Sequence, residues 1–257
     1  MLATSIYSII SVLIVSSIAF AGLFFLSVND KVLKNIIFVL VSFSVGALFG
    51  DAFVHLIPEA FKSGMKSSSI SAFIILGIIV FFVLEKFIHW KHSHGETDGV
   101  CEIHKEKNPV RPAGYIILLS DTAHNFLDGV IIAASYMISA EVGITTTIAV
   151  VLHEIPQEIG RFGLLIHYGF SRIKALLFNF FSALSAVLGA ALALSFGGNV
   201  SGFTPFIISL AAGGFIYIAG SDLVPEIHKT SDPKKSAIQF ISILGGIALM
   251  FAFLLIE

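Results

Sequence analysis

Long apolar segments alternate with short polar connections along the whole chain. Each segment has about 20 or more mostly hydrophobic residues, which is the length that crosses a lipid bilayer as an α-helix. Strands of an outer-membrane barrel would instead alternate polar and apolar residues over about ten positions. The pattern therefore predicts an all-α polytopic membrane protein with eight transmembrane helices, at residues 4–28, 35–61, 69–90, 113–138, 142–168, 173–196, 203–228 and 236–256.

The first apolar segment also has one feature of a secretory signal peptide. Ala19, Phe20 and Ala21 form a small-x-small cleavage pattern. However, no Lys or Arg precedes the segment, and its apolar run continues to Leu26. A signal peptide normally has a basic start and a short apolar core. We therefore expect a retained transmembrane helix.

The composition agrees with a membrane protein and excludes several other classes. Hydrophobic residues make up 56% of the chain and charged residues 12%, and the mean hydropathy is +0.94, whereas a soluble domain is about 25% charged. The single cysteine, Cys101, cannot form an intrachain disulfide. No basic cluster with interleaved aromatic residues points to a nucleic-acid partner. We expect one transmembrane domain over residues 1–257 that is embedded in the bilayer. The sequence leaves open whether the protein forms a homodimer.

The positive charges predict how the helices are oriented. Of the 15 Lys and Arg residues, twelve lie in or beside the connections after the first, third, fifth and seventh segments, and only Lys62 and Lys66 lie in the other connections. Cytoplasmic loops carry the excess of positive charge. We therefore expect these four connections in the cytoplasm and both termini outside, in a plasma or inner membrane.

The longest connection, at about 91–112, is polar and contains possible metal ligands. Imidazole and thiolate both suit zinc, but their spacing here does not match a closed structural zinc site. Weak, exchangeable metal capture on the cytoplasmic side and a merely solvated loop are both consistent with the sequence. The possible ligands are His92, His94, Cys101 and His104.

The fourth and fifth segments carry polar residues at helical spacing. His124 and Asp128 are four residues apart and share one helical face, with Asp121 a turn earlier. In the fifth segment, His153 and Gln157 form one such pair. Pro156 removes a backbone hydrogen bond and frees the carbonyl near Leu152. The remaining polar residues of these two stretches include Asn125, Glu154 and Glu158.

The second and seventh segments repeat this arrangement. Asp51, His55 and Glu59 follow one another at intervals of four residues, and Asp222 and Glu226 form a further pair. Pro58 and Pro225 lie within these stretches. Small residues also recur along the sixth and seventh segments, including Gly189 and Gly213, and they predict close contacts between helices.

Ionisable side chains inside a bilayer are expensive and are functional by default. Buried charges need a partner or a bound metal, and Arg161 is the only Lys or Arg in the deep parts of these spans. We therefore expect the buried carboxylates and imidazoles to hold protons or a mobile cation. Imidazole combined with carboxylate suits a first-row divalent ion such as zinc. The residues concerned are Asp51, His55, Glu59, Asp121, His124, Asp128, His153, Glu154, Asp222 and Glu226.

Four stretches of the chain resemble the ZIP family of zinc and iron transporters. They read GDAFVHLIPEA in the second segment, DTAHNFLDG in the fourth, HEIPQEIGRFGLL in the fifth and AAGGFIYIAGSDLVPE in the seventh. The resemblance implies a ZIP-like bundle of eight helices with both termini outside. It also implies alternating access, in which spans 1, 4, 5 and 6 move against spans 2, 3, 7 and 8.

The resemblance further assigns roles to individual residues. It implies a primary metal site made by His124, Asp128, His153 and Gln157. It implies an adjacent second site, known in some relatives, at Asn125 and Glu154. The route by which metal reaches the site would involve Asp51, His55, Asp222 and Glu226.

The chain also departs from the family pattern at positions that bear on metal binding. Gln157 stands where the family commonly has His or Glu, and residues 173–196 contain no Glu, although some relatives have one there. These departures argue against a fully bimetallic site. Arg161 stands where close relatives often carry an acid, and it either pairs with Glu158 or extends toward the membrane surface. In both cases it could repel a departing cation.

Two other functions compete with metal transport. The pattern His153-Glu154-x-x-Gln157 resembles the H-E-x-x-H signature of zinc hydrolases, but Gln replaces the second His and Pro156 interrupts the helix. A proton-coupled carrier of another solute would also use carboxylates and His, but its pocket should add convergent aromatic and amide groups. We therefore expect a transporter that moves zinc or a similar divalent ion toward the cytoplasm, with no enzymatic activity and no organic cofactor.

Overall fold

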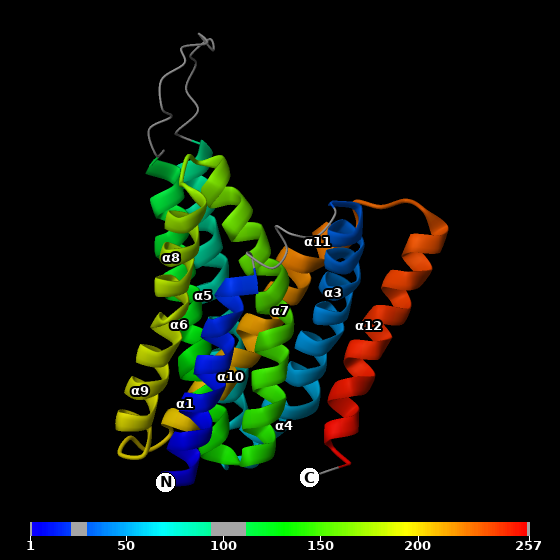
Figure 1. Cartoon of the computed structure of the whole chain (residues 1–257). Coiled ribbons are helices and arrows are strands. Elements are labelled where there is room, and N and C mark those ends of the chain that lie inside the picture. Colours follow the sequence, from blue (N-terminus) through cyan, green and yellow to red (C-terminus); the bar gives the residue numbers. More distant parts are fainter. Residues whose placement is uncertain (1, 22–29, 94–111, 256–257) are drawn as a thin grey trace, which may run out of the picture.

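The computed structural model describes residues 2–21, 30–93 and 112–255, and these residues form helices and turns without a strand (Figure 1). The first turn of α1 and the last turn of α12 lie at the same end of the bundle (Figure 1), as an even number of crossings requires. η1 is a 3-10 helix, whereas η2 and η3 are π-helices. The elements are α1 (Leu2–Ser17), η1 (Ile18–Phe20), α3 (Asp30–Gly50), η2 (Asp51–Leu56), α4 (Ile57–Lys62), α5 (Ser67–Ser93), α6 (Pro112–Ile138), α7 (Ala140–His167), α8 (Arg172–Ala183), α9 (Ser185–Gly197), α10 (Phe203–Tyr217), η3 (Ile218–Leu223), α11 (Val224–Ile227) and α12 (Pro233–Phe253).

The predicted all-α membrane architecture is confirmed. Seven helical segments among the described residues are long and apolar enough to cross a membrane, and α7, with 28 residues, is as long but carries charged side chains. The first predicted helix is helical up to Ala21, and its residues 22–28 lie outside the described part. The sixth predicted helix is divided at Leu184, whose carbonyl accepts a hydrogen bond from the backbone N–H of Val187, three residues on.

Proline explains the two π-helical turns, which the hydropathy pattern did not predict. Pro58 and Pro225 each follow a π-helix by two residues. A proline has no N–H, and its ring clashes with the carbonyl four residues earlier. A π-turn relieves this clash by widening the helix, and such turns are frequent at functional sites. The polar residues Asp51, His55 and Asp222 all belong to these turns.

Glycine pairs bring the backbones of certain neighbouring helices into direct contact. A Cβ atom at any of these glycines would collide with a backbone carbonyl oxygen of the facing helix, and small residues permit such close approach in membrane bundles. The contacts are reciprocal, because each glycine of a pair meets the helix that carries the other. The pairs are Gly129 and Gly189 between α6 and α9, Gly46 and Gly246 between α3 and α12, and Gly77 and Gly213 between α5 and α10.

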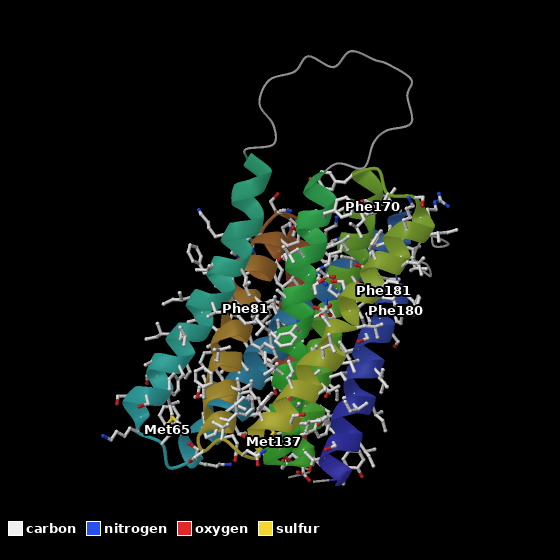
Figure 2. The ribbon with its side chains drawn as sticks, turned by 90° about the vertical axis from the view of Figure 1, so that its left-hand side faces the viewer. Met65, Phe81, Met137, Phe170, Phe180 and Phe181 are labelled. Carbon is white, nitrogen blue, oxygen red and sulfur yellow. The ribbon has the colours of Figure 1, made fainter. Side chains whose placement is uncertain are left out.

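The bundle exposes apolar side chains and buries polar ones. Leu188, Phe181 and Ile241 are 64%, 63% and 67% exposed, as lipid-facing residues would be. Phe181 lies on α8 at the edge of the bundle, whereas Phe81 of α5 lies inside it (Figure 2). The Phe81 ring packs edge-on against the imidazole of His124. The interior around α6 and α7 therefore combines aromatic rings with ionisable groups.

Candidate metal centre

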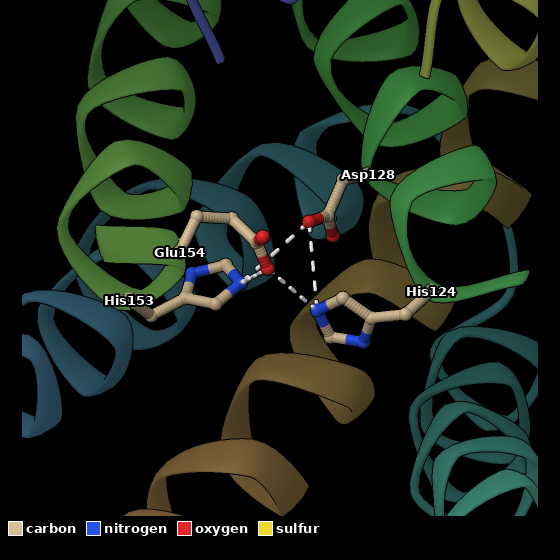
Figure 3. Close-up of side chains that lie close together, drawn as sticks. All are labelled: His124, Asp128, His153 and Glu154. Atoms are coloured by element: carbon tan, nitrogen blue, oxygen red, sulfur yellow. Dashed lines mark hydrogen bonds and ion pairs between the residues drawn. The ribbon is translucent and has the colours of Figure 1, made fainter. Parts of the chain in front are cut away.

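Two neighbouring helices bring four possible metal ligands together near their midpoints. His124 and Asp128 are one turn apart on α6, and His153 and Glu154 are adjacent on α7. Their side chains converge on a common point (Figure 3), and one ligand atom from each lies within 4.8 Å of the others. We call this group the His–Asp–Glu cluster.

The spacing of the ligand atoms suits a small divalent ion. Asp128 Oδ2 lies 3.6 Å from Nε2 of His124 and 3.6 Å from Nε2 of His153. Glu154 Oε1 lies 3.1 Å from Nε2 of His124 and 3.5 Å from Nε2 of His153. Four ligands around a tetrahedral zinc ion, each at about 2.0–2.1 Å, would be roughly 3.3 Å apart. The cluster therefore has nearly the dimensions of a zinc site.

The tautomer of His153 is favourable for metal binding. Its Nδ1 lies 3.0 Å from the carbonyl oxygen of Ala149, and because a carbonyl only accepts, Nδ1 must donate the proton. The lone pair then resides on Nε2, which points into the cluster and has no hydrogen-bond partner among the described residues. Metal-binding imidazoles are commonly oriented by such a bond from the other ring nitrogen.

Burial of the charged Asp128 carboxylate is energetically costly when no cation is bound. Asp128 is fully buried, and within the described part of the chain neither of its oxygens has a hydrogen-bond partner. A charged group in that state requires a compensating charge. Apolar rings from other helices pack against the cluster. The ring centroid of Phe81 in α5 lies 6.0 Å from that of His124, and the ring centroid of Phe215 in α10 lies 6.0 Å from that of His153.

Arg161 corrects the expectation that protons or a mobile cation alone compensate Asp121 and Glu154. Its Nη1 atom lies 2.5 Å from Asp121 Oδ1, 3.1 Å from Glu154 Oε2 and 3.5 Å from Glu158 Oε1. The expected pairing with Glu158 is therefore present. The side chain turns inward, between α6 and α7, and does not extend to the membrane surface, because three carboxylates attract it there.

Gln157 and Asn125, which the family resemblance placed in the metal sites, make other contacts. The amide oxygen of Gln157 accepts a hydrogen bond from Nη2 of Arg161. The amide nitrogen of Asn125 donates to the backbone oxygen and to Oδ1 of Asp121, both at 3.0 Å. Glu154, expected in the second site, has one oxygen in the His–Asp–Glu cluster and the other beside Arg161.

Asn179 of α8 was not among the residues predicted from the sequence. It is fully buried, and its amide nitrogen donates a hydrogen bond to Glu158 Oε2. A lone carboxamide in an otherwise apolar transmembrane segment is the signal that could have identified it, because polar groups in hydrocarbon need partners.

The residues of the predicted access route belong to η2, η3 and α11 and lie outside the His–Asp–Glu cluster. Asp51 and His55 are buried in η2, with Asp51 Oδ1 3.3 Å from His55 Nδ1. Glu226 is exposed on α11, forms an ion pair with Lys229 and lines a cavity of about 220 Å³ between α3, α11 and α12. Asp222 lies in η3, and its side chain is outside the described part of the structure. The route stays a prediction.

The predicted metal-capture loop falls almost wholly outside the described residues. His92 is in the last turn of α5, and its side chain is not described, whereas His94, Cys101 and His104 lie in the undescribed stretch 94–111. The metal-capture function of this loop also stays a prediction.

Comparison with known proteins gives a consistent result over nearly the whole chain. A family model described as "ZIP Zinc transporter" matches residues 2–111 and 91–254. The chain is 33% identical to "Zinc transporter ZIP13" of Pongo abelii over 228 residues, which cover 83% of this chain and 66% of that protein. It is 30% identical to "Zinc transporter SLC39A7" of Canis lupus familiaris over 326 residues, with 95% and 70% covered. It is 31% identical to "Zinc transporter ZIP13 homolog" of Drosophila melanogaster over 278 residues, with 86% and 78% covered.

Proposed function

The chain belongs to the ZIP family of zinc transporters and is thus a multi-pass carrier of divalent metal ions. We propose that it binds one ion between α6 and α7 and moves this ion toward the cytoplasm. The observation that carries this proposal is the His–Asp–Glu cluster, with ligand atoms from both helices within 4.8 Å of one another. The whole chain would act as a single transport domain, without an enzymatic reaction.

The binding step follows from the chemistry of the four side chains. Asp128 and Glu154 supply negative charge, and Nε2 of His153 presents a lone pair toward them. Mixed imidazole and carboxylate ligands suit zinc among the first-row ions. Binding neutralises buried carboxylates, so the ion is held where hydrocarbon and aromatic rings exclude water.

The packing of the helices supports alternating access between two groups. The first group comprises α1, α6, α7, α8 and α9, and the second comprises α3, α4, α5, α10, α11 and α12. The three reciprocal glycine contacts all join helices of the same group, so each group is tightly packed within itself. All four ligands come from the first group, while Phe81 and Phe215 of the second group cover them with apolar rings. Movement of one group against the other would carry the ion with its ligands intact.

The direction of transport rests on the distribution of positive charge. Of the connections predicted to be cytoplasmic, the two that the structure describes, between α7 and α8 and between α11 and α12, lie at the end of the bundle opposite the first turn of α1 and the last turn of α12 (Figure 1). Asp51, His55, Asp222 and Glu226 would then offer carboxylates and an imidazole to metal on its way to the cluster. The loop after α5 would meet metal after its release.

Zinc uptake into proteoliposomes tests this function. We expect His124→Ala and His153→Ala each to abolish most of the zinc uptake, because each removes one of four ligands. His228→Ala is the matched control, since this imidazole is exposed on the last turn after α11. Normal uptake by both cluster variants would place the transport site elsewhere. Competition with iron, manganese and cadmium in the same vesicles would rank the ions.

A further inference from the structure

The guanidinium of Arg161 occupies a site made of oxygen ligands directly beside the His–Asp–Glu cluster. Asp121 of α6 and Glu154 and Glu158 of α7 surround Nη1 at 2.5–3.5 Å. All three acids are at most 3% exposed. Arg161 therefore contacts three buried carboxylates at once, on two helices, which is the charge environment of a bound metal ion.

Glu154 links this site to the proposed transport site. Its Oε1 atom faces the two imidazoles, and its Oε2 atom faces Arg161 at 3.1 Å. A carboxylate with one oxygen on each of two neighbouring positive centres is the usual bridge in two-metal sites. In this chain one of the two centres is the guanidinium.

Two further buried amides complete the oxygen-rich surroundings. Asn125 is bonded to Asp121, and Asn179 is bonded to Glu158. Within the described residues, the Oδ1 atoms of both amides and Oδ2 of Asp121 lack hydrogen-bond partners. Carboxylate and amide oxygens are ligands for divalent cations, so this environment offers more acceptors than one guanidinium uses.

We propose that Arg161 is a tethered cation that fills a second metal site, and that it thereby limits the transporter to one bound ion. The proposal rests on the proposed transport site at the His–Asp–Glu cluster. The guanidinium cannot lose its proton in a protein, so the second site is occupied by positive charge at all times. Nη2 of Arg161 also donates a hydrogen bond to the amide oxygen of Gln157. This bond keeps the Gln157 oxygen within the second site.

Removal of this charge should convert the site into a functional metal site. Three buried carboxylates would then lack a counter-charge, and a buried charge of that kind is stabilised by binding a metal ion. A purely structural ion pair, which only holds α6 to α7, would make a different prediction. Its loss would weaken folding without adding a bound ion.

The test is the number of zinc ions bound per purified protein, measured by equilibrium dialysis and elemental analysis. We expect one ion for the natural protein and two for Arg161→Gln. Arg161→Lys should bind one, because an ammonium keeps the positive charge. Arg172→Gln, at the exposed start of α8, is the matched control and should also bind one.

Two additional variants separate this proposal from the proposed transport site. His153→Ala should lose the ion of the His–Asp–Glu cluster and bind none, while His153→Ala combined with Arg161→Gln should bind one. If His153→Ala still binds one ion, the transport site is wrong. If Arg161→Gln binds one ion while His153→Ala binds none, the transport site stands and the role of Arg161 is overturned.

A folding defect need not obscure the result. Glu158→Gln combined with Arg161→Gln leaves only Asp121 and Glu154 uncompensated, so it should fold more readily and still bind two ions. A single bound ion in this folded double variant would overturn the proposal. Two ions bound to the natural protein would overturn it without any substitution.

Discussion

The hydroxyl of Ser44 donates a hydrogen bond of 2.6 Å to the carbonyl oxygen of Leu152. This carbonyl is the one that lacks its helical partner, because Pro156, four residues on, has no N–H. The bond joins α3 to α7, and therefore joins the two helix groups at the residue that precedes His153. The same hydroxyl lies 2.7 Å from the carbonyl of Leu40 in its own helix.

Ser44→Ala should destabilise the described arrangement of the two groups. A buried carbonyl left without its partner costs about 1–3 kcal/mol, so we expect a lower melting temperature in detergent and an altered zinc uptake rate, with little change in zinc affinity. Ser42→Ala is the matched control, because the Ser42 hydroxyl is also buried but, among the described residues, donates to the carbonyl oxygen of Phe38 in its own helix and not to another helix. Equal melting temperatures for both variants would remove the proposed link between the groups.

Asp128→Asn should separate metal binding from folding. The amide keeps the shape and one oxygen but loses the negative charge, so we expect zinc affinity to fall at least about tenfold, or about 1.4 kcal/mol. The metal-free protein should be as stable as the natural one or more so, because a buried charge without hydrogen-bond donors among the described residues is replaced by a neutral amide. Isothermal titration and thermal unfolding measure the two effects.

Asp232→Asn provides the matched control for that substitution. Asp232 is the exposed N-cap of α12, and Asn is an equally good cap, so both zinc affinity and stability should be retained. An Asp128→Asn protein with unchanged zinc affinity would show that Asp128 does not touch the ion.

The arrangement of the helices follows from the sequence more directly than the charge pairing does. Hydropathy gave the spans, and the spacing of four residues on one helix placed His124 beside Asp128, because helix geometry alone fixes that relation. Arg161 lies seven residues after Glu154 on the same face, so their proximity was also available from spacing. That its guanidinium would reach Asp121 depends on how α6 packs against α7, which the spacing within one helix does not specify.

Zinc affinity should decrease as the pH falls. Protons compete with zinc for imidazole nitrogens and carboxylates, so binding must release protons whenever the ligands are protonated in the metal-free protein. We expect zinc affinity to be lower at about pH 5.5 than at about pH 7.5, because imidazole and carboxylate ligands must be deprotonated to bind the metal. Zinc titrations across this range, with unfolding measured at each pH, test the prediction. A constant affinity would argue against a site that contains both His124 and His153.

Cys101 offers a direct test of orientation, because it is the only cysteine in the chain. The distribution of positive charge predicts that the connection with Cys101 is cytoplasmic. A membrane-impermeant maleimide should therefore leave intact cells unlabelled and label the protein after the membrane is opened. Cys101→Ser should remain unlabelled in both conditions. Labelling of intact cells would reverse the predicted orientation and with it the proposed direction of transport.

Gly129→Ala should weaken the contact between α6 and α9, on which the position of the metal ligands of α6 depends. The added methyl group would strike the backbone of Ala186, which cannot move aside as a flexible side chain would. Forced overpacking typically costs about 1–3 kcal/mol, so the melting temperature should fall. Gly163→Ala is the matched control, because a Cβ atom there meets no atom within 4 Å. Alanine favours a helix over glycine, so this control should be unchanged or slightly more stable. Since Gly129 directly follows Asp128, the Gly129→Ala protein should also bind zinc more weakly, whereas Gly163→Ala should bind it normally. Equal melting temperatures and zinc affinities for the two variants would show that the close contact at Gly129 does not hold the ligands of α6 in place.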